Sequence, residues 1–200
     1  MTINVFVVGE DELCCAIAEA LLNNTGLDVN IYQRQNTKGE DQFRKKIPTM
    51  NNVAANVMPV LMIADADQAD CVVAQRNAWI PANADQRLCV RLAVREAESW
   101  ALADHVGFAQ FADLSPALIP PQPELEQDPK QRLLQLIHKS RRRVLREEML
   151  PKKGATSPVG LGYNVHITEY IRHHWRADRA CERAPSLARA IPRVAAILKN

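Results

Sequence analysis

The chain has 200 residues, of which 47% are hydrophobic and 24% charged, a composition that suits one domain of ordinary size or one domain with a helical extension. It contains no run of about 18 uncharged apolar residues, which argues against a membrane span. Its first residues lack the basic segment and cleavage motif of a secretory signal, so we expect a cytoplasmic protein. The five cysteines are odd in number and form no C-x-x-C pair, which argues against a disulfide framework or a zinc knuckle.

The small net charge of +2 conceals a strong asymmetry along the chain. Residues 1–129 carry 9 basic and 18 acidic side chains, whereas residues 130–200 carry 16 basic and 5 acidic ones. Such a division indicates either two faces of different electrostatic purpose or an acidic site beside a surface that binds a polyanion. The alternative is that the basic helices pack on the acidic half with most charges facing water.

The first half of the chain alternates between strand-like and helix-like segments. Predicted strands cover residues 3–8 (INVFVV), 27–33 (LDVNIYQ), 57–67 (VMPVLMIADAD) and 87–94 (RLCVRLAV). Predicted helices cover residues 11–24, a region up to about residue 56, and a stretch through Trp79. Strands that alternate with helices predict an α/β fold with a mostly parallel central sheet flanked by helices.

The second half of the chain is helical in pattern and basic in charge. Five of the twelve prolines fall in residues 115–129, which predicts a connection without regular structure. Helices are predicted over residues 129–148, 163–177 and 185–198, with a flexible basic connection at residues 151–162. We therefore expect an α/β domain over residues 1–114, a proline-rich connection over 115–129, and a basic helical subdomain over 130–200 that packs on the first.

The turn after the first strand discriminates between two kinds of ligand. A phosphate-binding turn needs several glycines, as in G-x-G-x-x-G, but Gly9 stands alone here. It is followed by the acids Glu10, Asp11 and Glu12, which would repel a phosphate and favour a cation. Of these three, Glu12 is expected to be a capping-box acid rather than a metal ligand.

Carboxylates follow three of the four predicted strands. Glu10 follows the first strand, Asp65 and Asp67 end the third, and Glu96 and Glu98 follow the fourth. Parallel strands place these ends at one edge of the sheet, and residues two apart on an extended backbone point to the same side. The five acids thus form a predicted metal site, although Asp65 or Asp67 alternatively caps the following helix. Glu96 and Glu98 diverge on a helix, which makes one of them the expected ligand.

Several longer strings make the comparison with a known family specific. The order of a strand-end glutamate followed by Asp-x-Asp resembles the Toprim superfamily of topoisomerases, primases and OLD-type nucleases. The string RLAVREAESWALAD resembles the Glu-x-Trp-Leu-Leu-Ala-Asp segment of a Toprim-like family of uncharacterised bacterial proteins. The strings DPKQRLLQL, SRRRVLREEMLP, GYNVHITEYI and APSLARAI resemble its C-terminal blocks, so the likeness covers most of the chain.

The turn after the first strand can be aligned with that family in two ways, called frames here. In the E-G-x-T-E frame Val8 stands at the glutamate's position, which would remove a catalytic residue. In the V-E-D-x-L frame Glu10 takes that position, and we prefer this frame because EDELCCAIAEALL then matches without a gap. Asp65 and Asp67 correspond to the Asp-x-Asp motif, and Glu98 corresponds to the glutamate before Trp100.

The resemblance implies Mg²⁺ or Mn²⁺ and chemistry on nucleic acid, with Glu10, Asp65, Asp67 and Glu98 as catalytic residues. A metal-dependent nuclease that cleaves DNA or RNA phosphodiesters, with a role in phage defence, is the first hypothesis. The superfamily also contains inactive members, and many relatives are encoded near ATPases or in defence clusters. The second hypothesis is therefore a noncatalytic subunit that docks on an ATPase or another protein.

Basic side chains concentrate after residue 129. The candidates for nucleic-acid binding are Lys130, Lys139, Arg141, Arg142, Arg143, Arg146, Lys152 and Lys153. On one continuous helix, Lys139 would share a face with Arg143, and Arg142 with Arg146. Aromatic residues make up only 5% of the chain, so we expect contacts to phosphates rather than base stacking. Lys130 and Lys152 are also candidates to reach the metal site, where a cation would stabilise charge on a phosphate.

The string IRHHWRADRAC offers a weaker zinc motif through His173, His174, Asp178 and Cys181. Adjacent histidines on a helix point about 100° apart and so do not converge on one ion. A basic helix face is the preferred interpretation of this segment.

Overall fold

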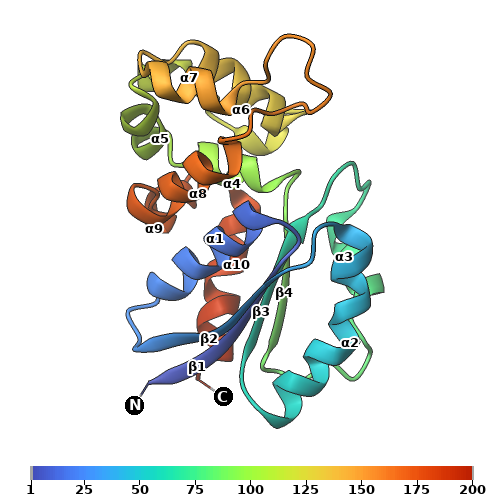
Figure 1. The fold of residues 1–200 in the computed structure, drawn as a ribbon. Helices are drawn as coiled ribbons and strands as arrows, with labels where there is room; N and C mark the ends of the chain where they lie inside the picture. Colours follow the sequence, from blue (N-terminus) through green and yellow to red (C-terminus); the bar gives the residue numbers. More distant parts are fainter. Residues whose placement is uncertain (1, 200) are drawn as a thin grey trace.

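The computed structural model describes residues 2–199 and has an α/β fold with a helical C-terminal part (Figure 1). Its single sheet has four strands in the order β2-β1-β3-β4, and every pair is parallel. The strands are β1 (Ile3–Gly9), β2 (Val29–Asn36), β3 (Val60–Asp65) and β4 (Leu88–Ala93). The predicted fold class is confirmed, and all four strands lie close to their predicted positions.

The register of the strands brings three carboxyl ends to the same edge. Gly9 of β1 lies opposite Ile63 of β3, and Asp65 at the end of β3 lies opposite Ala93 at the end of β4. The residues that follow each strand therefore leave the sheet side by side. This arrangement follows from parallel pairing, in which successive strands present the same end to the same edge.

Alternating side chains of the strands enter two separate layers of core. Val5 and Val7 pack with α1 (Glu12–Asn23) and α10 (Pro185–Ile197) on one face. Phe6 and Val8 pack on the other face with α2 (Glu40–Asn56), and α3 (Val72–Trp79) adds its partly buried end residues to the same cluster. Figure 1 shows the sheet between these two helical layers. Because both faces are covered, the two central strands β1 and β3 are almost continuously apolar, whereas the edge strand β2 is largely polar.

The remaining helices lie beyond the carboxyl ends of the strands (Figure 1). They are α4 (Ala97–Ala103), α5 (His105–Ala112), α6 (Pro129–His138), α7 (Arg143–Met149), α8 (Tyr163–His173) and α9 (Ala177–Ala180). Between α5 and α6 the proline-rich connection forms two short 3₁₀ turns, η1 (Pro116–Leu118) and η2 (Pro123–Leu125). The chain then returns along the sheet as α10, which packs on β4 and α1.

One apolar cluster joins the sheet to the C-terminal helices. It includes Trp100, Tyr170 and Trp175 together with residues of β1, β3 and α1. The indole of Trp100 donates to Ser186 Oγ at 2.7 Å, and the indole of Trp175 donates to the Trp100 carbonyl at 2.9 Å. The helices after residue 129 thus share a core with the first half of the chain.

The helix predicted over residues 129–148 is interrupted, which corrects the sequence prediction. The chain leaves the helical path after His138, where Ser140 Oγ donates to the Ala112 carbonyl at 2.5 Å and accepts from the Arg142 N–H at 3.0 Å. A serine that bonds the backbone in this way competes with the helical hydrogen bonds. As a result, Lys139 and Arg143 belong to different segments and do not share a helix face.

Among the described residues, no helix combines the length and the apolar character needed to traverse a bilayer.

Candidate functional site

Glu10 leaves β1 at the start of a tight turn into α1. The turn is possible because Gly9 has no side chain: a Cβ at this position would lie 2.5 Å from the Cys15 backbone nitrogen. Asp11 caps α1 by accepting from the Cys14 N–H at 2.8 Å. Glu10 Oε2 meanwhile accepts from the Asp65 N–H at 3.1 Å, so it bridges the ends of β1 and β3.

Asp65 connects the end of β3 with the helix that follows β4. It is only 8% exposed, and its Oδ1 accepts from the Ala97 N–H at the first turn of α4 at 2.8 Å. From the sequence, Asp65 was a candidate to cap the helix after its own strand. In the structure it accepts from the first turn of α4 instead. This contact is possible because β4 is the parallel neighbour of β3, so α4 begins beside the end of β3. The Cys14 thiol lies 3.7 Å from the same oxygen.

Glu98 is the most deeply buried acid of the group, with 1% exposure. Its Oε1 accepts from the Tyr163 hydroxyl at 2.8 Å and lies 3.4 Å from Lys130 Nζ. Its Oε2 is buried and has no hydrogen-bond partner among the described residues. A buried carboxylate oxygen without a donor is unusual, because such atoms are almost always paired with protein or water.

The other two predicted ligands occupy the margin of this group. Glu96 is half-buried and its Oε2 accepts from the Lys130 N–H at 2.9 Å, which ties the start of α4 to the start of α6. Asp67 is exposed and has a φ of 50°, so the extended backbone needed to align it with Asp65 does not continue past the end of β3. The extended backbone on which the expectation for Asp65 and Asp67 rests therefore ends before Asp67, and their shared direction stays a prediction.

The buried acids hold their protons more tightly than free carboxyl groups do. Burial raises the pKa of Glu10 to about 7 and that of Glu98 to about 6, although Lys130 opposes the second shift. Burial also raises the pKa of Asp65 well above its ordinary value, and the charge of Glu98 adds to this rise. Desolvation and like charge both disfavour the ionised form, so these acids would gain from a nearby cation.

Lys130 supplies one such cation from within the chain. Its side chain is partly buried, and burial by itself would lower the pKa of its ammonium group. The charges of Glu98, Asp65 and Glu96 outweigh burial and raise that pKa above its usual range. Predicted as a nucleic-acid contact with a possible role at the metal site, Lys130 lies beside the acids in the structure.

Two contacts in this region were not predicted from the sequence. Tyr163 was not selected because a tyrosine at the start of a helix has no signature of contact with a residue 65 positions earlier. Glu12 was expected to form a capping box, but it instead binds Arg34 Nη2 at 2.5 Å and Asn36 Nδ2 at 2.8 Å. The capping-box prediction failed because Asp11 is itself the cap, which leaves Glu12 in the first turn facing β2.

The predicted basic residues are divided between paired and unpaired side chains. Arg142 donates to the Phe111 carbonyl at 2.9 Å, Arg146 donates to the Ser140 carbonyl, and Arg143 pairs with Glu147 at 2.6 Å. Arg141 lies 3.9 Å from Asp113. Lys139, Lys152 and Lys153 are exposed. Their ammonium groups make no hydrogen bond or ion pair within residues 2–199, so these three are the side chains most available for phosphate contacts.

The chemistry of the acids suits a hard divalent cation, whereas their arrangement does not form a complete cage. Across residues 2–199, no three His, Cys, Asp or Glu side chains are placed to hold a metal ion by themselves. Mg²⁺, however, is commonly held by one or two carboxylates together with water and substrate phosphate oxygens. The unpartnered Oε2 of Glu98 and the raised pKa values of Glu10 and Asp65 fit a site of that kind.

The fold and the site define an α/β protein with buried carboxylates at the carboxyl edge of a parallel sheet, adjoined by a basic helical part. The chain matches no protein-family model, and no curated protein or solved structure shows significant similarity to it.

Proposed function

We propose that this protein is a cytoplasmic Mg²⁺- or Mn²⁺-dependent, nuclease-like phosphodiesterase of Toprim type that acts on DNA or RNA, with a role in phage defence. The observation that carries the proposal is the meeting of half-buried Glu10 with buried Asp65 and Glu98, which come from three strand ends yet belong to one linked group of acids. The resemblance of EDELCC, DAD and EAESWALAD to Toprim-like motifs supports it from the sequence.

Each residue has a defined part in this proposal. Glu98 and Asp65, with Glu10 beside them, would hold the metal; Asp67 and Glu96 lie at the margin, where water ligands would connect them to it. A bound divalent ion lowers the pKa of its water and stabilises the leaving oxygen of a phosphodiester. Lys130 faces the same acids and would attract the phosphate, while Lys139, Lys152 and Lys153 would contact the rest of the strand.

A second candidate function rests on the same contacts. Asp65 caps α4, Glu96 binds the start of α6, and Glu98 pairs with Lys130, so each acid also has a structural partner. A Toprim-like subunit that has lost catalysis and docks on an ATPase or another defence protein would retain such contacts. In that protein Lys130 would replace the cation permanently.

Calorimetric titration of Mg²⁺ and Mn²⁺ into wild type and into the Asp65→Asn and Glu98→Gln variants distinguishes the nuclease from the noncatalytic subunit. These amide variants are preferable to alanine because an amide oxygen can still accept from Ala97 or Tyr163. We expect wild-type binding in the micromolar to millimolar range, weakened at least about tenfold in each variant because a charge-assisted ligand is lost. Glu12→Gln is the matched control, since Glu12 pairs with Arg34 outside the group.

Cleavage of DNA and RNA substrates by the same proteins completes the test. The nuclease proposal predicts metal-dependent cleavage by wild type and Glu12→Gln but not by Asp65→Asn or Glu98→Gln. Cleavage retained in both amide variants, or no metal binding by well-folded wild type with the substrate present, would reject it. A stoichiometric protein complex that forms equally well with the amide variants would support the docking subunit instead.

A further inference from the structure

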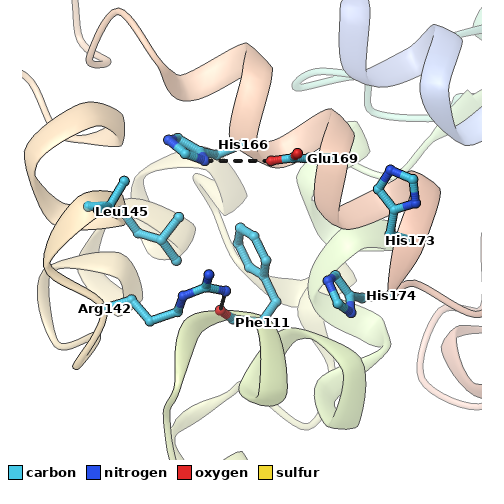
Figure 2. A pocket seen from close by; sticks show the side chains of 8 residues that line it. Phe111, Arg142, Leu145, His166, Glu169, His173 and His174 are labelled. Atoms are coloured by element: carbon cyan, nitrogen blue, oxygen red, sulfur yellow. Dashed lines mark hydrogen bonds and ion pairs between the residues drawn. The ribbon is translucent and has the colours of Figure 1, made fainter.

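A pocket on the C-terminal part is lined by a cluster of basic and imidazole side chains outside the carboxylate site. Its volume is about 240 Å³, and its walls come from α5, α7 and α8. Figure 2 shows Arg142 and His174 beside Phe111, with His166 and Glu169 across the pocket. Pockets for drug-sized ligands usually measure about 300–1,000 Å³, so this one suits a smaller group.

The Arg142 side chain is held in place before any ligand arrives. Its backbone N–H donates to Ser140 Oγ at 3.0 Å, its Nη1 donates to the Phe111 carbonyl at 2.9 Å, and its guanidinium lies 5.8 Å from the Phe111 ring centre. A guanidinium carries five N–H donors, and within residues 2–199 only Nη1 is engaged in a hydrogen bond. A fixed guanidinium with spare donors is suited to bidentate recognition of a phosphate.

The imidazoles around this space differ in whether an N–H is free. His166 Nε2 contacts Glu148 Oε2 at 2.6 Å, a pairing that fixes the orientation of its ring and engages the one N–H of the neutral imidazole. The ring of His174 lies 6.2 Å from that of Phe111 and lines the pocket with an N–H that even a neutral imidazole retains. Glu169 is the opposing group, because its carboxylate lies 4.0 Å from His166 Nδ1 and would repel an anion.

We infer that this pocket binds a phosphate group, with Arg142 as the principal contact and His174 as a supporting donor. The pocket contains none of the acids assigned to the metal site, so phosphate binding here does not require the protein to be a nuclease. Only the identification of the phosphate as the end of a nucleic-acid strand rests on the proposed function. Inorganic phosphate and a strand terminus present the same chemistry, and the experiment distinguishes them.

NMR titration of the full-length, metal-free protein with inorganic phosphate is the test, followed through the ring signals of His166 and His174. Two substitutions should act in opposite directions. Arg142→Gln should weaken binding about tenfold through loss of a charge-assisted contact, whereas Glu169→Gln should strengthen it several-fold by removing a like charge. Arg44→Gln, at an arginine on α2 that pairs with Glu40 and lies outside the pocket, should leave the affinity unchanged.

A second titration compares an oligonucleotide carrying a 5′-phosphate with the same strand ending in a hydroxyl. Tighter binding of the phosphorylated strand would identify a strand terminus as the source, and equal binding of the two strands would identify free phosphate. The inference is overturned if phosphate does not bind to folded wild type, or if Arg142→Gln and Glu169→Gln bind it as wild type does. Both phosphate titrations are made in the presence of EDTA, which keeps the protein free of metal. Their outcome is therefore independent of the metal titrations that test the proposed function.

Discussion

Two glutamates in one turn have opposite electrostatic environments. Glu10 is half-buried against the end of β3, and burial raises its pKa to about 7. Glu12, two residues later, lies against Arg34, whose hydrogen bond lowers the pKa of that carboxyl. Sequence composition treats the two acids alike. Their difference arises because β3 meets one side of the turn and β2 the other.

This difference gives a prediction about stability and pH. Folding raises the pKa of Glu10, so its favourable contribution is present near pH 4.5 and is lost as the pH rises towards 7. Glu10→Gln should therefore flatten the decline in the free energy of unfolding over this range in metal-free protein. Urea denaturation at several pH values would measure it, and added Mg²⁺ at pH 8 should restore stability to wild type more than to the variant.

Glu12→Gln provides the reverse case. Because folding lowers the pKa of Glu12, its contribution is present above pH 4.5 and is lost as the pH falls below that value. This variant should be less stable than wild type at pH 7 and similar to it in strong acid. Parallel pH profiles for the two variants would show that the assigned environments are wrong.

Tyr163→Phe tests the contact that orients Glu98. The substitution removes the hydroxyl that donates to Glu98 Oε1 and leaves a buried carboxylate with fewer partners. We expect a loss of about 1–3 kcal/mol in the free energy of unfolding, the usual range for a buried group that loses its partner. Tyr32→Phe, at a ring that is 63% exposed, is the control and should change stability little.

The candidate site shows what the residues alone could predict. Strand periodicity and parallel topology were enough to bring Glu10, Asp65 and the start of α4 to one edge. The backbone at Asp67 was not predictable, because strand periodicity does not reveal that this residue adopts a positive φ. Tyr163 and the orientation of Lys130 depend on how α8 and α6 pack, and no local pattern encodes that packing.

At the level of helices, Asp104 joins three elements at one buried carboxylate. It is fully buried and accepts from the Gly107 N–H at the start of α5 and from the Arg176 N–H before α9. Arg179 donates to both its oxygens, at 2.8 and 2.7 Å. The last residue of the ESWALAD string therefore has a structural role that the motif did not reveal.

Asp104→Ala should reduce the free energy of unfolding by about 3 kcal/mol, since it leaves two backbone donors and a guanidinium without their acceptor. Thermal and urea unfolding would measure the loss. Asp178→Asn removes an exposed partner of Arg176 and should change stability by less than about 0.5 kcal/mol. Equal effects of the two substitutions would contradict the role assigned to Asp104.

Helix boundaries reveal a second limit of sequence interpretation. Apolar spacing predicted helix on both sides of Ser140, and the structure has α6 and α7 there. The interruption between them depends on the carbonyl of Ala112, 28 residues earlier, which accepts from the serine hydroxyl. A hydrogen bond to a distant residue leaves no trace in a local periodicity.

For the whole molecule, the shared core predicts that residues 1–114 do not fold alone. Trp100 is fully buried, and its indole is bound by Ser186, so removal of the later helices would expose a large apolar surface. We expect the fragment to lack a cooperative unfolding transition and dispersed NMR signals. Coexpression with residues 115–200 should restore both, whereas a well-dispersed spectrum from the fragment alone would establish an independent N-terminal domain.

The return of α10 to the sheet also affects how the protein is made. This helix packs against β4 and α1, although the strands it covers are synthesised well before it. Until residues 185–197 have left the ribosome, one face of the sheet lacks part of its cover, and the nascent chain exposes apolar residues of β1, β3 and α1. Exposed surface of this kind favours aggregation. This part of the protein is therefore expected to complete its fold only once α10 has left the ribosome, and to bind chaperones before that point.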